Sequence, residues 1–515
     1  MNTAHPILTC AEAQTLEERL LGSDEKRIWE AMCKAGAGVG AGVLRDFPQL
    51  RPLPRNPRVL VLAGPGHNGG DALLAAVEIL RARPRAKVTA VFEGEFKPLA
   101  KKALDELLHH ECVECLTFAQ FLAQMKKGES WDIVIDGLYG MSFRPPLPAK
   151  ARELLKAFNE NLEVAAFRAA VDLPSGLNGT SATLAFHADF TYATGIAKTP
   201  LFDSANAKWV GRIRYVDIGF FDGVYVGPHE SSESLITPNI LEPLRRLRPA
   251  TADKRMCGRL LVISGSHAYP GAQMLNVLGA LRAGAGLVTA LTPATHAGAF
   301  AAARPEAMWH ACAEESDGCH GAATLAAARE VWPRATAVLA GSGLGKSPHA
   351  QAMLDALVTE CPLPMVLDAD ALTKATLEAL KERPKKAGAV VLTPHAGEFE
   401  RLAGKGADLR AFCRKHRVVT VLKGPVTRVC DGDRVWCSTF GGPVLARGGS
   451  GDVLAGIAGT LLAQTPDEPF MATARAVVWQ GLAADALAHE RGETAALTAE
   501  IPTHMPAALR GEWGV

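Results

Sequence analysis

The stretch Gly448-Gly449-Ser450-Gly451-Asp452 runs directly into Val453-Leu454-Ala455-Gly456. Small residues let a backbone approach a ligand closely, and a helix that follows them adds its N-terminal dipole, so the run predicts an anion-binding turn. A carboxylate is unfavourable there unless it has a task, such as taking the proton of a hydroxyl that receives a phosphoryl group. The alternative is a glycine-rich turn with a chance acid. Lys423-Gly424, behind the strand-like Val418–Leu422, favours a nucleotide site instead.

Composition limits the classes of function. A chain of 515 residues predicts more than one domain. Lys and Arg number 55 against 54 Asp and Glu, so the net charge of +1 gives no reason to expect nucleic acid or a membrane as a partner. We find no membrane-spanning run and no signal-peptide pattern, and the eleven scattered cysteines favour a reducing compartment. We therefore expect a cytoplasmic protein.

Two groups of cysteine and histidine could suggest zinc: His109-His110 with Cys112 and Cys115, and His310 with Cys312, Cys319 and His320. Structural zinc needs four ligands, which usually come from two spaced pairs. Neither group has a convincing second pair, so ordinary loop or helix-end residues are the preferred interpretation.

A pattern of short apolar strands, glycine-rich turns and Ala/Leu-rich helices occurs twice along the chain. Such alternation predicts a parallel sheet covered on both faces. In the first half we expect strands at residues 58–63, 87–92, 131–136, 164–172 and 212–218. In the second half we expect them at 260–264, 287–291, 337–340, 365–368, 390–393 and 418–422. Residues 472–489 should form a packing helix, and the segments before Thr9 and after Pro502 should be less ordered.

Oxygen-bearing turns follow three expected strands of the first half. Gly66–Asp71 contains Asn68, Ile133-Val134-Ile135 ends in Asp136, and Val171–Leu177 contains Ser175. Each residue alone could be a turn or cap residue. Because the carboxyl ends of parallel strands meet at one crevice, all three together favour a site. Their hard oxygen donors suit an alkali or alkaline-earth cation rather than zinc.

These motifs resemble the NAD(P)H-hydrate epimerase family, although His67, Ala72 and Met141-Ser142 depart from its pattern of Asn, Gly and Thr-Gly. The resemblance implies a potassium site at Asn68, Asp136 and Ser175, with Asp172 beside the substrate as a catalytic residue. It also implies hydrate-binding loops at His67, Asn68, Gly69, Gly70 and Asp71, and at Gly140, Met141, Ser142, Phe143, Arg144, Pro145 and Pro146.

The second half carries a denser set of turns after expected strands. They are Lys254–Ser266, Pro270-Gly271-Ala272, Arg282–Gly286, Gly341–Gly345, Asp368–Leu372, Thr393–Glu398, Lys423-Gly424 and Gly448–Asp452. Lys254 or Glu398 alone could be a solvated charge, and His395 alone a satisfied loop histidine. These single-residue interpretations do not explain why so many of these turns follow an expected strand.

This ordered set resembles the ADP-dependent NAD(P)H-hydrate dehydratase family, which has a ribokinase-like fold, from about Thr237 onward; Thr373 replaces its usual Asn. The resemblance implies hydrate contacts at Ala272, Gly343, His395 and Asp452, with Asp452 as the catalytic base. It implies nucleotide contacts at Lys423, Gly424, Pro425, Val426, Thr427 and Gly451.

Together the two resemblances, in this order, match the family of bifunctional NAD(P)H-hydrate repair enzymes. They imply two three-layer αβα domains: a Rossmann-like epimerase domain at 1–226, a linker at 227–236, and a ribokinase-like dehydratase domain at 237–515. They also imply potassium for the first domain, magnesium for the second, and a homo-oligomer. The expected substrates are NADHX, NADPHX and ADP, with the epimerase supplying the S hydrate.

Two competing functions stay open at this point. The first is a small-molecule kinase of the ribokinase class, because the same anion site and base would phosphorylate an alcohol. The segment Thr393–Glu398 and the fused first half argue against it. The second is a first domain that only binds a ligand or partner.

Overall fold

The computed structural model describes residues 2–125, 130–160, 166–179, 182–223 and 233–512. The chain divides into two compact units, Met1–Ser232 and Glu233–Val515. Residues 227–232 of the expected linker lie outside the described residues, and its last three, Ser234–Ile236, form strand β10 of the second unit. Among the described helices, none has the length and apolar character that crossing a bilayer requires.

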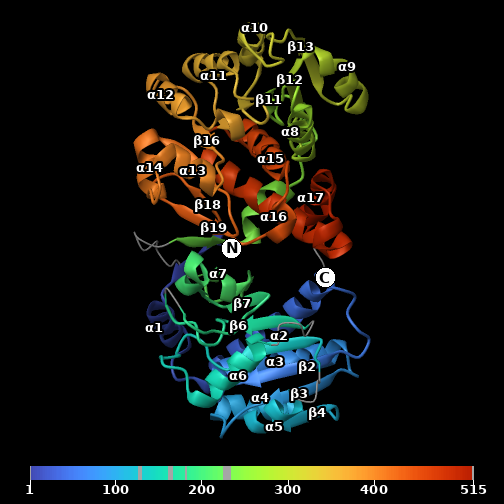
Figure 1. The fold of residues 1–515 in the computed structure, drawn as a ribbon, viewed down its shortest axis with the longest axis vertical. Coiled ribbons are helices and arrows are strands. Elements are labelled where there is room, and N and C mark those ends of the chain that lie inside the picture. The colour runs from blue at the N-terminus through green and yellow to red at the C-terminus, as the bar shows by residue number, and fades with distance from the viewer. Residues whose placement is uncertain (1, 126–129, 161–165, 180–181, 224–232, 513–515) are drawn as a thin grey trace. The chain divides into compact units, whose positions relative to one another are not determined.

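The first unit is built on a parallel sheet in the order β4-β3-β2-β5-β6-β7-β9 (Figure 1). Its central strands are short apolar runs, as expected where both faces are covered. The strands are β2 (Arg58–Ala63), β3 (Lys87–Val91), β4 (Val113–Leu116), β5 (Ile133–Gly137), β6 (Phe167–Val171), β7 (Phe190–Thr194) and β9 (Arg212–Val216). A separate parallel pair joins β1 (Ala4–Leu8) to β8 (Ala197–Lys198) and places Leu8 opposite Lys198.

Helices cover both faces of this sheet. One face packs on α2 (Glu25–Asp46), α3 (His67–Ala82) and α4 (Pro98–Leu108), and the other packs on α5 (Phe118–Met125) and α6 (Ala149–Glu160). The remaining helices are α1 (Cys10–Leu21) and the single turn α7 (Ala207–Val210). The predicted three-layer α/β architecture is therefore confirmed for this unit.

The second unit contains a sheet in the order β13-β12-β11-β14-β15-β16-β17-β18-β19-β10. Strands from β13 through β17 are parallel, and β18 and β19 return as antiparallel hairpins. The strands are β10 (Ser234–Ile236), β11 (Arg259–Ile263), β12 (Leu287–Pro293), β13 (Met308–Cys312), β14 (Ala337–Ala340), β15 (Met365–Leu367), β16 (Val390–Leu392), β17 (Val418–Leu422), β18 (Thr427–Cys430) and β19 (Val435–Ser438).

Two groups of helices sandwich this second sheet (Figure 1). One core forms against α8 (Pro270–Arg282), α15 (Ser450–Gln464), α16 (Pro469–Ala495) and α17 (Ile501–Arg510). The other forms against α10 (Ala322–Val331), α11 (Pro348–Glu360), α12 (Lys374–Glu382), α13 (Ala396–Ala403) and α14 (Leu409–His416). Helix α9 (Ala294–Ala303) joins β12 to β13. The predicted α/β fold is confirmed here too.

The expectation of less order at both ends is wrong for the described residues. Residues 4–8 form β1 because they pair with β8, and residues 501–510 form α17 because Ile501 and Met505 are buried in the core. Both elements depend on tertiary contacts with distant segments, which a local pattern does not contain.

Candidate active sites

In the first unit, Asp136 and Ser175 form a buried pair where β5 and β6 end. Ser175 donates from its Oγ to Oδ1 of Asp136 over 2.6 Å and from its N–H to Oδ2 over 2.7 Å. Both residues have no exposed surface. Burial raises the pKa of Asp136 to about 6, although these hydrogen bonds oppose the rise. A cation would therefore compensate a carboxylate that is poorly solvated at this point.

Asn68 lies against the same strand end from the first turn of α3. A methyl group at Gly140 would lie 3.1 Å from Oδ1 of Asn68, and one at Gly137 would lie 2.7 Å from its backbone oxygen. The Nδ2 atom of Asn68 is buried without a hydrogen-bond partner. The structure thus gathers Asn68, Asp136 and Ser175, and their oxygen donors are of the hard type that fits potassium.

Gly69 and Gly70 in this turn are also needed for packing, independently of any ligand. A methyl group at Gly69 would lie 1.9 Å from the carbonyl oxygen of Gly64, and one at Gly70 would lie 2.3 Å from the side chain of Met32. Asp71 is buried, with Oδ1 unpartnered, and burial together with Asp172 and Glu17 raises its pKa well above the usual range. His67 is exposed at the helix start.

Asp172 follows β6 in the left-handed region, with φ of 65°. Its carboxylate accepts a hydrogen bond from Nζ of Lys198, which also donates to the carbonyl oxygen of Thr194 over 3.1 Å. Side-chain exposure is only 1% for Lys198 and 8% for Asp172. Burial lowers the pKa of Lys198, but the charges of Asp172 and Glu17 outweigh this effect and raise it. The amine is therefore a buried cation beside the predicted catalytic residue.

Two further groups interact electrostatically with this ion pair from α1. Burial, the largest effect, raises the pKa of Glu17 to about 7, while Lys198 opposes the rise and Asp172 adds to it. Burial and Asp172 raise the pKa of the Cys10 thiol. The ion pair therefore lies among acidic groups. The positive charge of Lys198 offsets their negative charge.

The loop expected to bind the hydrate lies between β5 and α6. Asn178 donates to the carbonyl oxygen of Phe143, and the Arg144 guanidinium donates to the same oxygen over 3.1 Å. Phe143 is buried, whereas the sequence-predicted contacts on either side lie at the surface: Ser142, Arg144, Pro145 and Pro146 are exposed, and Gly140 and Met141 are half-buried.

In the second unit, α15 begins within the glycine run, as predicted. Gly449 precedes the helix with φ of 88°, and no side chain caps the helix N-terminus. The Ser450 hydroxyl donates to the carbonyl oxygens of Leu445 and Arg447 over 2.7 and 2.9 Å, which turns it away from the helix end. An uncapped helix N-terminus with glycines around it leaves N–H groups for an anion.

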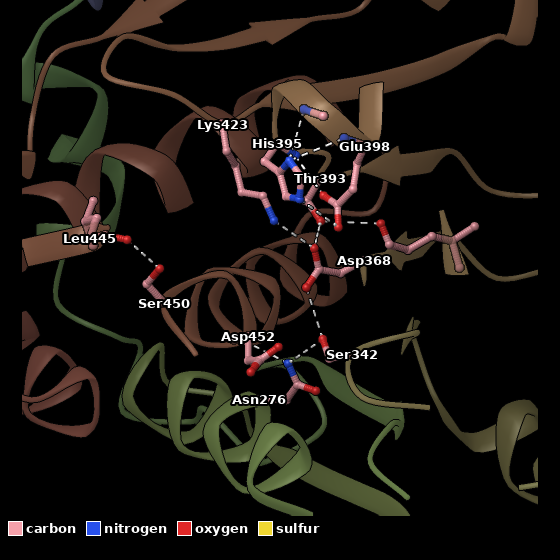
Figure 2. Close-up of polar contacts among 12 residues, drawn as sticks. Asn276, Ser342, Asp368, Thr393, His395, Glu398, Lys423, Leu445, Ser450 and Asp452 are labelled. Carbon is pink, nitrogen blue, oxygen red and sulfur yellow. Dashed lines mark hydrogen bonds and ion pairs between the residues drawn. The ribbon is translucent and has the colours of Figure 1, made fainter. Parts of the chain in front are cut away.

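Lys423, where β17 ends, lies above this helix start. A methyl group at Gly451 would lie 3.1 Å from Nζ of Lys423. The same Nζ forms an ion pair with Oδ1 of Asp368 at 3.1 Å. Figure 2 draws this contact as a dashed line. The rest of the predicted nucleotide segment forms the turn after β17 and, at Thr427, the first residue of β18, with Gly424 and Pro425 exposed. The structure therefore brings together the ammonium group of Lys423, the N-terminus of α15 and the exposed turn after β17.

Asp452 occupies the first turn of α15, half-buried. Its backbone oxygen accepts a hydrogen bond from Nδ2 of Asn276 over 2.7 Å (Figure 2). Burial, followed by the charge of Asp368, raises the pKa of Asp452 to about 7, against the opposing effects of Ser342 and Lys423. A carboxyl group with this pKa can accept a proton near neutral pH.

His395 caps α13 and lies beside Lys423 in the sheet. Its Nδ1 accepts from the N–H groups of Gly397 and Glu398 over 3.1 and 3.3 Å, so the neutral ring carries its proton on Nε2. Nε2 lies 3.5 Å from a carboxylate oxygen of Glu398. The cap role and a ligand role are compatible, because the side chain is 55% exposed.

Ala272 and Gly343 adjoin one another on α8 and on the loop after β14. Gly343 has φ of 65°, and a methyl group there would lie 2.8 Å from Cβ of Ala272. The position therefore excludes a side chain on both backbone and steric grounds. The predicted hydrate contacts Ala272 and Gly343 form one surface, and His395 and Asp452 lie in the polar region of Figure 2.

Three functional candidates were missed from the sequence. Lys198 stands alone in the apolar segment Tyr192–Leu201, and an isolated lysine there was a usable signal. Asn276 carried none, because it lies within an ordinary helix pattern. Ser342 lay inside a recognised glycine turn, yet its bond to Asp368 over 3.1 Å joins residues 26 positions apart.

Comparisons with known proteins cover both units. The family model of NAD(P)H-hydrate dehydratases matches residues 260–506, and the model of the YjeF-related protein N-terminus matches residues 30–200. Several proteins named bifunctional NAD(P)H-hydrate repair enzyme are similar over nearly their whole length. One from Gloeobacter violaceus is 36% identical over 94% of this chain and 93% of its own, and one from Coxiella burnetii is 30% identical over 95% and 96%.

Among solved structures, the ADP/ATP-dependent NAD(P)H-hydrate dehydratase from Bacillus subtilis, co-crystallized with ATP and Mg²⁺, is 28% identical to this chain. It aligns with a TM-score of 0.45 over 54% of this chain and 97% of its own.

Proposed function

Because the chain belongs to the family of bifunctional NAD(P)H-hydrate repair enzymes, we propose that it restores hydrated NADH and NADPH in two steps. The first unit interconverts the R and S hydrates, NADHX or NADPHX. The second unit dehydrates the S hydrate at the expense of ADP and yields AMP and phosphate. The observation that carries the second step is Asp452 on the uncapped start of α15, with Lys423 above Gly451.

The dehydration begins at the hydroxyl of the hydrated ring. Asp452 takes the hydroxyl proton, and the oxygen attacks the terminal phosphorus of ADP as the bond to AMP breaks. Lys423 and the N–H groups around Gly451 offset the charge on the transferred group. Phosphate then leaves with the electron pair of the ring C–O bond, and loss of a proton from the neighbouring ring carbon restores the dihydronicotinamide.

Magnesium would neutralise charge on the phosphates during this transfer. Such a metal needs only one or two protein carboxylates in addition to phosphate oxygens. The chemistry of Asp370 fits this need, because one carboxylate oxygen accepts from the N–H of Gly345 at a neighbouring strand end. Asp368 fits less well, because its oxygens already accept three hydrogen bonds.

In the first unit, potassium would be held by Asn68, Asp136 and Ser175 and would fix the loops around the hydrate. Asp172 would exchange protons with the substrate, and Lys198 would hold its carboxylate in place. Replacing potassium by choline at constant ionic strength should lower epimerisation and leave dehydration of the S hydrate unchanged. Equal rates in both salts would contradict the potassium assignment.

The deciding experiment supplies purified protein with the mixed NADHX epimers and ADP, and follows the absorbance of restored NADH. Complete conversion of both epimers, with one AMP and one phosphate per NADH, is expected. The kinase alternative is not favoured by the relatives, which match both units. A stable phosphoester without NADH would nevertheless support it.

A further inference from the structure

Asp368 lies between the cation and the base of the second site without facing open solvent. It follows β15, and its side chain is 2% exposed. Oδ1 accepts from the Thr393 hydroxyl over 2.6 Å and from Nζ of Lys423 over 3.1 Å, and Oδ2 accepts from the Ser342 hydroxyl over 3.1 Å (Figure 2). Three donors from three strand ends thus fix one buried carboxylate.

This carboxylate is charged in spite of its burial. The ammonium group of Lys423 and the hydroxyl groups of Thr393 and Ser342 all donate to it, which is the environment of a carboxylate anion rather than of a neutral acid. A long lysine side chain has many rotamers, and a fixed buried anion selects one of them. In that rotamer Nζ lies over Gly451, at the helix start.

The same carboxylate connects to Asp452 through neutral groups. Ser342 donates to Asp368 and accepts from Nδ2 of Asn276 over 3.2 Å, and that Nδ2 also donates to the backbone oxygen of Asp452. The charged groups that act on Asp452 are Asp368 and Asp370, after β15, and Lys423, after β17. Helix α8 contributes the neutral Asn276, and α13 contributes the capped pair His395 and Glu398.

We propose that Asp368 is a positioning residue of the dehydration step, which holds Lys423 over the phosphoryl site and whose negative charge keeps Asp452 a strong enough base. The inference rests on the proposed function. Asp368 has no role in direct contact with the substrate, because its oxygens are buried and occupied. It acts on position through Lys423 and on basicity through its charge, and these two effects can be measured separately.

The test compares D368N, D370N and T393V with the wild-type chain, using S-NADHX, ADP and a range of pH. Asparagine keeps the shape of Asp368 and removes its charge. We expect D368N to move the acid limb of the kcat/KM profile down by about one pH unit. It should also lower kcat/KM at the optimum about tenfold to a hundredfold, with a higher KM for ADP.

The two other variants separate charge from position. D370N removes a charge whose effect on Asp452 is smaller, so its acid limb should move less than that of D368N. T393V keeps the charge of Asp368 but removes its shortest hydrogen bond, so KM for ADP should rise while the acid limb stays in place. Epimerisation by the same chains reports on folding of the first unit, and thermal unfolding reports on the second.

An unshifted acid limb in a folded D368N would overturn the role of its charge, and an unchanged KM for ADP in both D368N and T393V would overturn the positioning of Lys423. If D368N does not fold, T393V alone decides the positioning of Lys423, and an acid limb that stays in place in D370N would overturn the action of the carboxylates after β15 on Asp452. A wild-type chain that forms no NADH from the S hydrate and ADP would overturn the proposed function itself, and the inference with it.

Discussion

Asp452 has its proton affinity set by position rather than by residue type. Partial burial and the neighbouring Asp368 raise its pKa to about 7, far above the usual value of 3.8 for an aspartate. The backbone of Asp452 is held by Asn276, 176 positions away in the chain. A carboxyl group with this pKa is partly deprotonated at neutral pH and is still basic enough to take a hydroxyl proton.

A pH dependence follows from this pKa. The raised value means that Asp452 becomes protonated as the pH falls through about 7, and the protonated form cannot act as a base. We expect kcat/KM for dehydration to fall about tenfold per pH unit below that point. This pH dependence can be measured from initial rates of NADH formation from S-NADHX. The rates are taken between pH 5 and pH 9, at steps of about half a pH unit. A flat profile down to pH 5 would contradict the assignment of the base.

The substitution Asp452→Asn should remove the base without changing the size of the side chain. We expect dehydration to fall by about 10²- to 10⁴-fold, the usual contribution of general base catalysis. Interconversion of the R and S hydrates by the same chain should continue, since it belongs to the other unit. Loss of both activities in a folded variant would show that this division of labour is wrong.

Lys198 is a residue whose removal should affect stability as much as chemistry. Breaking a buried ion pair leaves one charge uncompensated, which typically costs about 3–5 kcal/mol. We expect Lys198→Met to destabilise the first unit by about this amount, and the double variant with Asp172→Asn to recover part of the loss. Hydrogen exchange of the β6 and β8 amides would measure both. Equal losses in the single and double variants would argue against a coupled pair.

At the scale of elements, the start of α15 depends on one glycine more than on its neighbour. Gly449 has φ of 88°, and a methyl group there would lie 2.4 Å from the side chain of Leu275, whereas one at Gly448 would meet nothing within 4 Å. We expect Gly449→Ala to cost about 2 kcal/mol or more from backbone strain and overpacking. Gly448→Ala, the matched control, should cost less than about 0.5 kcal/mol. Urea unfolding of the two variants would compare them, and equal stabilities would contradict this account.

The sequence predicted most of the buried central strands, but it missed the buried interior strand β7 and the edge strands β4 and β13. Residues 58–63, 337–340 and 418–422 were expected as strands and form β2, β14 and β17 with the same bounds. Strands β4 and β13 were not expected, because they lie at sheet edges and are largely exposed, and so lack a continuous apolar run. Their pairing is a tertiary property that local composition does not encode.

The same limit applies to the candidate sites. Residues such as Asp136 and Lys423 could be found because each directly follows an apolar strand, and parallel strands bring their carboxyl ends together. Lys198 could be noticed only as an isolated lysine in an apolar segment, and Asn276 could not be noticed at all, since their roles come from partners 26 and 176 positions away. Strand-end motifs therefore predict where a site lies, while the residues that set its charge and rotamers require the folded structure.

At the scale of the whole molecule, each unit has its own sheet, core and candidate site. The two chemistries also need different environments: a buried pair of hard oxygen donors for a cation in the first unit, and an open anion site with a raised-pKa carboxylate in the second. Joining them in one chain keeps the two activities in fixed proportion, because every chain that dehydrates the S hydrate also carries the site that produces it.

This arrangement predicts complementation between two single-site variants. Asp136→Ala should abolish epimerisation, because it removes the buried carboxylate that pairs with Ser175. It should leave dehydration intact. Asp452→Asn should do the reverse. With R-NADHX and ADP, neither variant alone should form NADH faster than the uncatalysed interconversion allows. Mixing the two should restore NADH formation, because the S hydrate can diffuse from one chain to the other. Failure of the mixture, with each variant retaining its own activity, would show that the hydrate passes between the two sites without release.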